Sequence, residues 1–194
     1  MKDDAVRVLV VDDDESLTEV YAAWLDDAYH VETATSGAAA LDALDQDVGV
    51  VLLDRRMPDL TGGEVLETIR AEEYDCRVAM VTGVRPDENV IDMGFDEYLL
   101  KPVDRDDLHS VVDRLMERLA YDDKLQEHYS LAAKRAALTA EATRAEDPES
   151  VQEAIRTVDD RLDEVESEMD RVVDAFAFDD FRVAFRDIAG ADDD

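Results

Sequence analysis

Acidic, hydroxyl and amine side chains follow directly after four separate apolar runs of the sequence. In chain order they are Asp12, Asp13, Asp54, Thr82 and Lys101. Carboxylates that converge ionise together only beside a cation, and a small set of oxygen ligands suits Mg²⁺. An aspartate can also attack phosphorus and form an acyl phosphate, while an ammonium and a hydroxyl position the transferred group. These residue types therefore predict magnesium-assisted phosphoryl transfer to a carboxylate.

The apolar runs alternate with helical patterns over residues 1–120, which is typical of an α/β domain with a parallel sheet. The predicted strands are 6–11, 30–35, 48–53, 77–81 and 97–100. The predicted helices are 16–25, 36–44 with Ser36 as its cap, 63–71, 87–93, and one from Asp104 or Asp106 to about Leu119. We expect a flavodoxin-like, five-stranded parallel sheet of order 2-1-3-4-5. Its ligand site then lies at the carboxyl ends of the first and third strands, which carry the acids.

Residues 121–194 contain one proline, one glycine and no strand pattern. We expect a helix over 122–144, a break at 146–150, a second helix to Phe176 and a separate segment over 178–188. The first helix places these residues along one side: Leu125, Tyr129, Ala132, Ala136 and Thr139. The second has apolar residues at alternating spacings of four and three: Val151, Ile155, Val158, Leu162, Val165, Met169, Val172 and Phe176. This spacing predicts a seam, either inside an all-α helical hairpin or between two chains of a homodimer.

The chain is strongly acidic, with 52 acidic and 20 basic residues and a formal net charge of −32. The excess of acidic over basic residues is found both in residues 1–120 and in residues 121–194, and aspartate outnumbers glutamate by 34 to 18. An evenly acidic surface indicates a cytoplasm of very high salt, where a Debye length of roughly 3 Å weakens repulsion. The sequence has no basic stripe of the kind that sequence-independent nucleic-acid binders use.

Composition also excludes several classes of protein. No apolar run approaches the ~18 residues of a membrane span, and the first residues lack a secretory pattern, so we expect no membrane association. Cys76 is the only cysteine, which excludes a disulfide framework and suits a reducing cytoplasm. Hydrophobic residues make up 46% of the chain, which is enough for a folded core.

Four segments of the first 120 residues resemble the receiver domain of two-component response regulators. They are VLVVDDD (8–14), LLDRRMPDLTGGE (52–64), MVTG (80–83) and MGFDEYLLKPV (93–103). The resemblance implies that Asp54 is the phosphoacceptor. It also implies a Mg²⁺ site made by Asp12, Asp13, Asp54 and the backbone carbonyl of Arg56, with Asp13 as a direct ligand.

The same resemblance assigns roles around the phosphoryl group. Thr82 matches the switch hydroxyl, and Tyr98 matches the aromatic side chain that moves inward with it. Lys101 matches the lysine that contacts the phosphoryl group, and its peptide bond to Pro102 is cis in the family. Gly83 stands where alanine is commoner, which leaves room for access to the phosphoryl group.

The last residues resemble HalX, a small helical domain that follows receivers in haloarchaea. The resemblance is carried by YDDKLQEHYSLAAKRAAL (121–138) and DDFRVAFRDI (179–188). We therefore expect a receiver domain over 1–120 and a HalX-like helical domain over 121–194.

Together these observations predict a response regulator that a sensor histidine kinase phosphorylates on Asp54 with Mg²⁺. The helical domain is expected to provide the output, through a change in its packing or dimerisation. Two alternatives remain open: a transcription regulator that binds DNA, and a docking adaptor for a protein target. A turnover phosphatase is disfavoured because Arg56 stands where such enzymes usually carry a second carboxylate. The receiver is expected only to assist its own phosphorylation and dephosphorylation.

Overall fold

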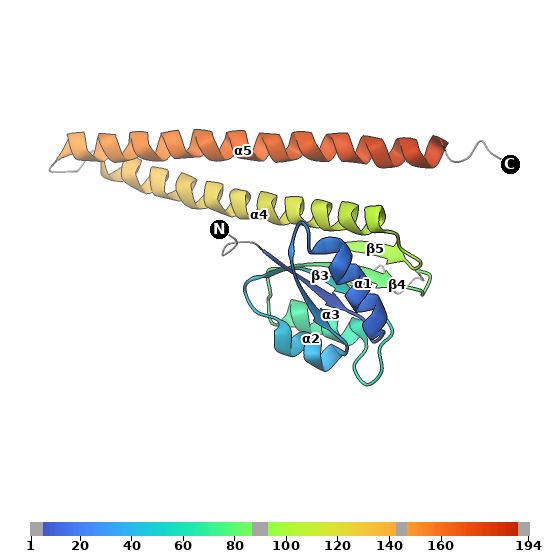
Figure 1. Cartoon of the computed structure of the whole chain (residues 1–194). Helices are drawn as coiled ribbons and strands as arrows, with labels where there is room; N and C mark the ends of the chain where they lie inside the picture. The colour runs from blue at the N-terminus through green and yellow to red at the C-terminus, as the bar shows by residue number, and fades with distance from the viewer. Residues whose placement is uncertain (1–5, 87–92, 143–146, 190–194) are drawn as a thin grey trace. The chain divides into compact units, whose positions relative to one another are not determined.

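The computed structural model describes residues 6–86, 93–142 and 147–189 of the chain, with 174–189 described as backbone alone (Figure 1). The chain divides into two compact units, Met1–Leu119 and Ala120–Asp194. The predicted helix over 87–93 falls almost wholly outside the described residues. In the part that is described, no helix has an apolar stretch long enough to cross a membrane.

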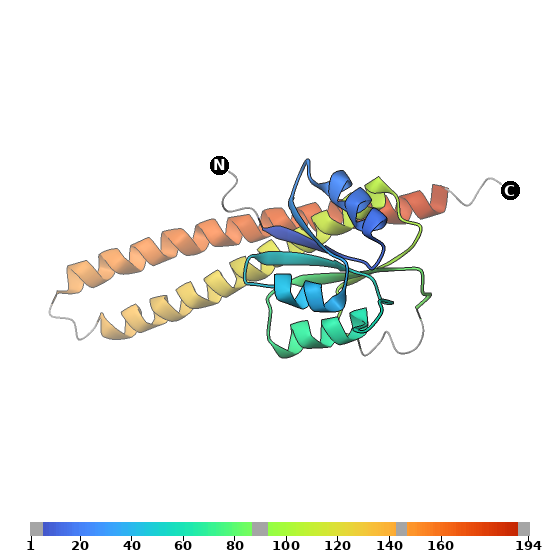
Figure 2. The ribbon, with the colours of Figure 1, turned by 60° about the horizontal axis from the view of Figure 1, so that its bottom comes forward.

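The first unit is built on a parallel sheet, in which the described residues form five strands of order β2-β1-β3-β4-β5 (Figures 1 and 2). The strands are β1 (Arg7–Val11), β2 (His30–Ala34), β3 (Val48–Leu53), β4 (Arg77–Thr82) and β5 (Glu97–Leu100). The predicted fold class and strand order are confirmed. Because the strand order reverses between β1 and β3, a site can form in the crevice at the carboxyl ends of these two strands.

Helices cover both faces of the sheet and make two separate cores. They are α1 (Glu15–Leu25), α2 (Gly37–Ala43), α3 (Gly62–Ala71) and the first part of α4 (Arg105–Glu141). In β1, Val8 and Val10 belong to the core under α1 and α4, while Leu9 and Val11 belong to the core under α2 and α3. Side chains of a strand alternate between faces, so a strand covered on both sides reads as an unbroken apolar run.

Polar side chains cap the helices and so set where they begin. The Asp14 carboxylate accepts from the amide of Ser16 before α1, and the Ser36 hydroxyl accepts from the amide of Ala39 before α2. Of the two caps expected for the last helix of the unit, it is the carboxylate of Asp104 that accepts from the amide of Asp107, at 2.8 Å. Capping side chains accept hydrogen bonds from amides that have no partner inside the helix. Short polar residues therefore predict where these helices begin.

Two predicted helix ends are wrong. Helix α4 does not stop near Leu119 but continues to Glu141, and α5 (Pro148–Ala189) has no break after Phe176. Neither stretch contains an internal proline or glycine, so nothing in the backbone chemistry stops either helix. Pro148 opens α5 at its first position, where its missing N–H costs no hydrogen bond.

The second unit pairs the later part of α4 with α5 (Figures 1 and 2). The predicted seam of α5 is buried or half-buried at each position from Val151 to Val172, and Val165 is fully buried. The side chain of Phe176, and those of the predicted apolar segment 178–188, lie outside the described residues. A helical hairpin within the chain is therefore confirmed, while a homodimer stays a prediction.

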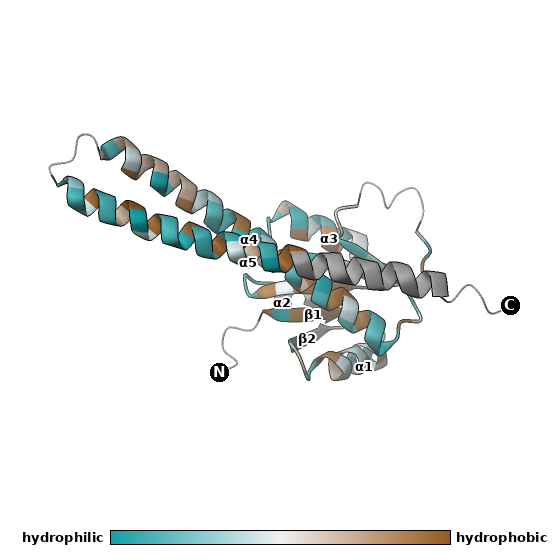
Figure 3. Ribbon diagram, turned by 90° about the horizontal axis from the view of Figure 1, so that it is seen from above, coloured by the Kyte–Doolittle hydropathy of each residue, from teal (hydrophilic) through white to brown (hydrophobic). Residues whose placement is uncertain are grey.

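The side that α4 presents to α5 differs from the prediction. Leu125 and Ala132 are half-buried as expected, but Tyr129, Ala136 and Thr139 are exposed. His128 takes a half-buried position instead. Adjacent residues of a helix point about 100° apart, so two neighbouring stripes of the helix can each be traced at spacings of four and three. The sequence of α4 fits the two stripes almost equally well. Contact with α5 decides between them. In Figure 3 the coloured parts of α4 and α5 carry mostly hydrophilic residues, with hydrophobic ones between them.

Candidate phosphoacceptor site

Asp54 stands at the carboxyl end of β3 and is only 5% exposed. Its amide donates to the carbonyl of Val11 at the end of β1, at 2.9 Å, so the neighbouring strand holds its backbone. Its Oδ1 accepts from Lys101 Nζ at 2.7 Å, and its Oδ2 accepts from the amide of Arg56 at 2.5 Å. Both carboxylate oxygens are therefore fixed by donors.

Asp12 occupies the matching place after β1 and is 3% exposed. Its Oδ2 accepts from Lys101 Nζ at 2.5 Å, and its Oδ1 accepts from the amide of Asp14 at 3.1 Å. The Lys101 ammonium thus bridges the carboxylates of Asp12 and Asp54. Burial by itself lowers the pKa of Lys101, but the hydrogen bonds to the two carboxylates outweigh it and the net shift is upward.

Asp13 lies beside these residues in sequence but is exposed, and Asp14 serves as the cap of α1. Within the residues described, no group of three histidine, cysteine or acidic side chains is arranged to hold a metal ion. The donor set nevertheless suits one: Asp12, Asp13 and Asp54 carry three negative charges against the single positive charge of Lys101. A divalent cation with a preference for oxygen ligands balances the remainder.

Thr82 and Tyr98 are linked through one backbone residue, Val84. The Thr82 hydroxyl, at the buried end of β4, accepts from the amide of Val84 at 3.3 Å. The Tyr98 hydroxyl donates to the carbonyl of Val84 at 2.8 Å. The half-buried Tyr98 ring packs against Phe95. The geometry thus joins the two predicted switch residues through the segment that follows β4.

The loop after Asp54 returns to the site through Gly62. A Cβ at this position would lie 2.1 Å from the carbonyl oxygen of Asp54, so only glycine lets α3 begin here. Arg56 is exposed, and its backbone amide is held by Asp54. The Lys101–Pro102 peptide bond is cis. Sequence reasoning did not single out Gly62 or Val84; the pair Gly62-Gly63 at the start of a helix was the only available signal for the former.

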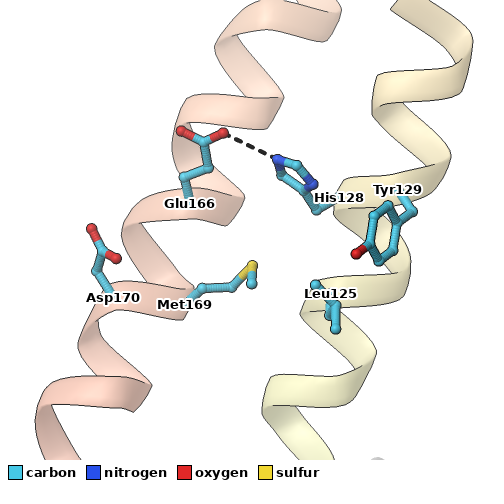
Figure 4. Close-up of a pocket in the computed structure, with 6 residues that line it drawn as sticks. All are labelled: Leu125, His128, Tyr129, Glu166, Met169 and Asp170. Carbon is cyan, nitrogen blue, oxygen red and sulfur yellow. Dashed lines mark hydrogen bonds and ion pairs between the residues drawn. The ribbon is translucent and has the colours of Figure 1, made fainter.

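A groove lies on the second unit, between α4 and α5 (Figure 4). It is lined by Leu125, His128, Tyr129, Glu166, Met169 and Asp170. His128 Nε2 donates to Glu166 at 3.0 Å, and Tyr129 is 62% exposed. The residues that line it include no lysine, so the groove does not repeat the lysine-bridged pair of carboxylates of the Asp54 site.

Comparison with known families identifies both units. The response regulator receiver domain matches residues 8–113, and the HalX domain matches residues 117–185. Among solved structures, a CheY-like receiver domain protein from Methanospirillum hungatei shares 29% identity, with a TM-score of 0.55, over 62% of this chain and 98% of that one. The response regulator TrrA from Thermotoga maritima, solved with Mg²⁺ and beryllofluoride, shares 31% identity, with a TM-score of 0.50, over 56% of this chain and 97% of that one.

A curated relative extends across both units. It is a Haloferax volcanii protein named "Putative transcriptional regulator", 43% identical over 169 residues, which is 86% of this chain. The chain spans only 28% of the length of that relative. Since the receiver match covers more than half of the chain and the HalX match follows it directly, the chain belongs to the response regulators, as a receiver domain followed by a HalX domain.

Proposed function

We propose that Asp54 accepts a phosphoryl group from the phosphohistidine of a sensor histidine kinase. The observation that carries the proposal is the Lys101 ammonium bridging Asp54 and Asp12, at 2.7 and 2.5 Å. A carboxylate at a strand end, nearly buried and beside a cation, is a poised nucleophile in a place where phosphoryl charge can be neutralised.

In the proposed step, an oxygen of Asp54 attacks phosphorus and the bond to the kinase histidine nitrogen breaks. The product is an acyl phosphate, and the histidine leaves with the electron pair. Lys101 stays within reach of the incoming phosphoryl oxygens because its backbone amide donates to the carbonyl of Thr82 at 2.9 Å. Asp12, Asp13, Asp54 and the backbone carbonyl of Arg56 would hold a Mg²⁺ ion, which would supply charge neutralisation.

The phosphoryl group would then accept a hydrogen bond from the Thr82 hydroxyl, whose oxygen already accepts from the amide of Val84, so a shift of Thr82 toward the phosphoryl group would act on Val84. A change at Val84 reaches Tyr98 directly, because the Tyr98 hydroxyl donates to the Val84 carbonyl. We propose that a receiver over residues 1–120 acts in this way as a switch, not as a turnover enzyme. The HalX domain over residues 121–194 provides the output, through its packing or its self-association.

The proposal is tested by exposing wild-type protein to a phosphohistidine-bearing kinase or a small acyl phosphate with Mg²⁺, in about 3 M KCl. We expect a gain of one phosphoryl group by intact mass, labile to base, in wild type and not in Asp54→Asn. Light scattering with beryllofluoride, a mimic of phosphoryl on Asp54, then asks whether the oligomeric state changes. Equal labelling of both proteins would refute Asp54 as the acceptor.

Regulation of transcription through DNA is a second candidate, favoured by the name of the Haloferax relative. Against direct DNA binding, residues 121–194 carry 22 acidic and 9 basic side chains. Phosphate contacts need basic groups and weaken further in high salt. A gel shift with genomic fragments at molar KCl, with and without beryllofluoride, separates DNA binding from docking to a protein target.

A further inference from the structure

Strand β5 places Lys101 and Tyr98, yet little in the strand itself holds it. It has four residues, it lies at the edge of the described sheet beside β4, and its side chains are half-buried or exposed. A slip of one residue along β4 would move Lys101 by roughly 3.3 Å and turn Tyr98 to the opposite face. A displacement of this size would break the hydrogen bonds of 2.5 and 2.7 Å that Lys101 Nζ donates to Asp12 and Asp54. The register of β5 therefore decides whether the site forms.

Asp96, the residue before β5, pins this register at two points on one residue of β4. Its amide donates to the carbonyl of Val78 at 2.8 Å, and its Oδ2 accepts from the amide of Val78 at 2.8 Å. The carboxylate completes a pair of bonds that backbone groups alone would not make. Any other register separates both groups of Asp96 from Val78.

Two arginines hold the Asp96 carboxylate in place. Arg70 donates to Oδ2 at 2.9 Å and Arg77 to Oδ1 at 3.0 Å, and the Asp96 side chain is only 14% exposed. The same Arg70 guanidinium donates to the carbonyls of Gly94 at 2.7 Å and Cys76 at 2.8 Å. One side chain of α3 thus ties together the segments that lead into β4 and β5. Charge-assisted bonds with planar, many-donor geometry make such a clamp stiff.

We propose that Asp96, clamped by Arg70 and Arg77, is a positioning residue that sets the register of β5 and so delivers Lys101 to Asp54. Asp96 touches neither carboxylate of the site and acts only through the strand that follows it. The inference rests on the proposed function of Asp54 for its effect on phosphorylation, but not for its effect on the strand.

The test compares Asp96→Ala and Asp96→Asn with a control at the opposite edge of the sheet. The control is Glu32→Gln, because Glu32 lies on the other edge strand, β2, and forms an ion pair with Arg7 at 2.8 Å. Hydrogen exchange of the Lys101 amide reports the register, and calorimetric titration with Mg²⁺ and beryllofluoride reports the site.

We expect Asp96→Ala to speed exchange of the Lys101 amide about tenfold or more, and to weaken beryllofluoride binding by about tenfold. Asp96→Asn keeps an acceptor for Val78 but loses attraction for two guanidinium groups, so its effects are smaller and in the same direction. Glu32→Gln lowers thermal stability and leaves both readouts unchanged. If Asp96→Ala fails to fold, Asp96→Asn carries the test.

Wild-type exchange and wild-type binding in both Asp96 variants, with only thermal stability lowered, would overturn the inference. Failure of the wild-type protein itself to bind beryllofluoride counts against the proposed function of Asp54. In that case the exchange rate of the Lys101 amide still decides whether Asp96 sets the register.

Discussion

The two units of the chain differ in whether they bury charge: among the described residues, the buried carboxylates lie in the first unit. In the first unit the carboxylates of Asp12 and Asp54 are nearly buried and share one ammonium, that of Lys101. In the second unit the ion pairs lie along the surface of the hairpin. They include Lys124–Glu168, Arg161–Glu127 and Arg135–Asp159.

The difference indicates which interactions fix the structure of each unit. A buried cluster of charge is costly to maintain, and removing one partner leaves the others unsatisfied, so its geometry is tightly held. Surface pairs contribute little to stability and are screened by salt. The first unit therefore holds one arrangement of its buried charges, while the described part of the second is held chiefly by an apolar seam.

A matched pair of truncations should give the largest effect and sharpen this contrast. Ile69 is fully buried on α3, whereas Ile155 is half-buried in the seam of α5. Ile69→Ala is expected to lower the free energy of unfolding by about 2–5 kcal/mol, and Ile155→Ala by about half as much, because less area is lost. Denaturant unfolding measures both. Equal costs would mean that the seam is packed as rigidly as the core.

Removing the bridging charge should give the next largest effect. Lys101→Met leaves the carboxylates of Asp12 and Asp54 facing each other, with an expected cost near neutral pH of about 3 kcal/mol. The pKa of Lys101 is raised above 10.5 in the folded protein, so its contribution is fully present below that pH and is lost as pH rises through the folded value. The difference in stability between wild type and variant should therefore narrow above about pH 10.5. A constant difference across that range would contradict the bridge.

The matched lysine of the hairpin should matter far less. Lys124 Nζ pairs with Glu168 at 2.7 Å on the surface, and this hydrogen bond is the main reason that its pKa is raised. Lys124→Met is expected to shift the thermal midpoint by less than about 3 °C, and by less still in molar KCl. A shift as large as that of Lys101→Met would break the comparison between the units.

The smallest structural effect is expected at Gly83, next to Thr82. A Cβ at Gly83 meets no atom within 4 Å, and its backbone is not left-handed. Gly83→Ala should change the free energy of unfolding by no more than about 0.5 kcal/mol. Under the proposed function, the added methyl narrows the approach of water, so the acyl phosphate on Asp54 should live longer. Its decay, followed by intact mass, measures this; an unchanged lifetime would mean that position 83 does not control access.

Much of the first unit follows from local sequence. Strand β3 lies where its apolar run predicts it, and Ser36 caps α2 as expected, because burial on two faces and capping leave direct marks in the sequence. The ends of α4 were harder to predict. The residues around Leu119 suit a helix whether or not the domain ends there, so no local signal separates one long helix from two short ones.

What the sequence determined by itself is the chemistry: which strand ends carry acids, a hydroxyl and an amine, and hence which reaction they suit. Only the tertiary structure decided how those ends are brought together. The bridge of Lys101 to Asp12 and Asp54 joins residues 89 and 47 positions apart, and the clamp of Arg70 and Arg77 on Asp96 leaves no periodic pattern. The physical reason is that residue type is local, whereas register and convergence depend on contacts between segments that are distant along the chain.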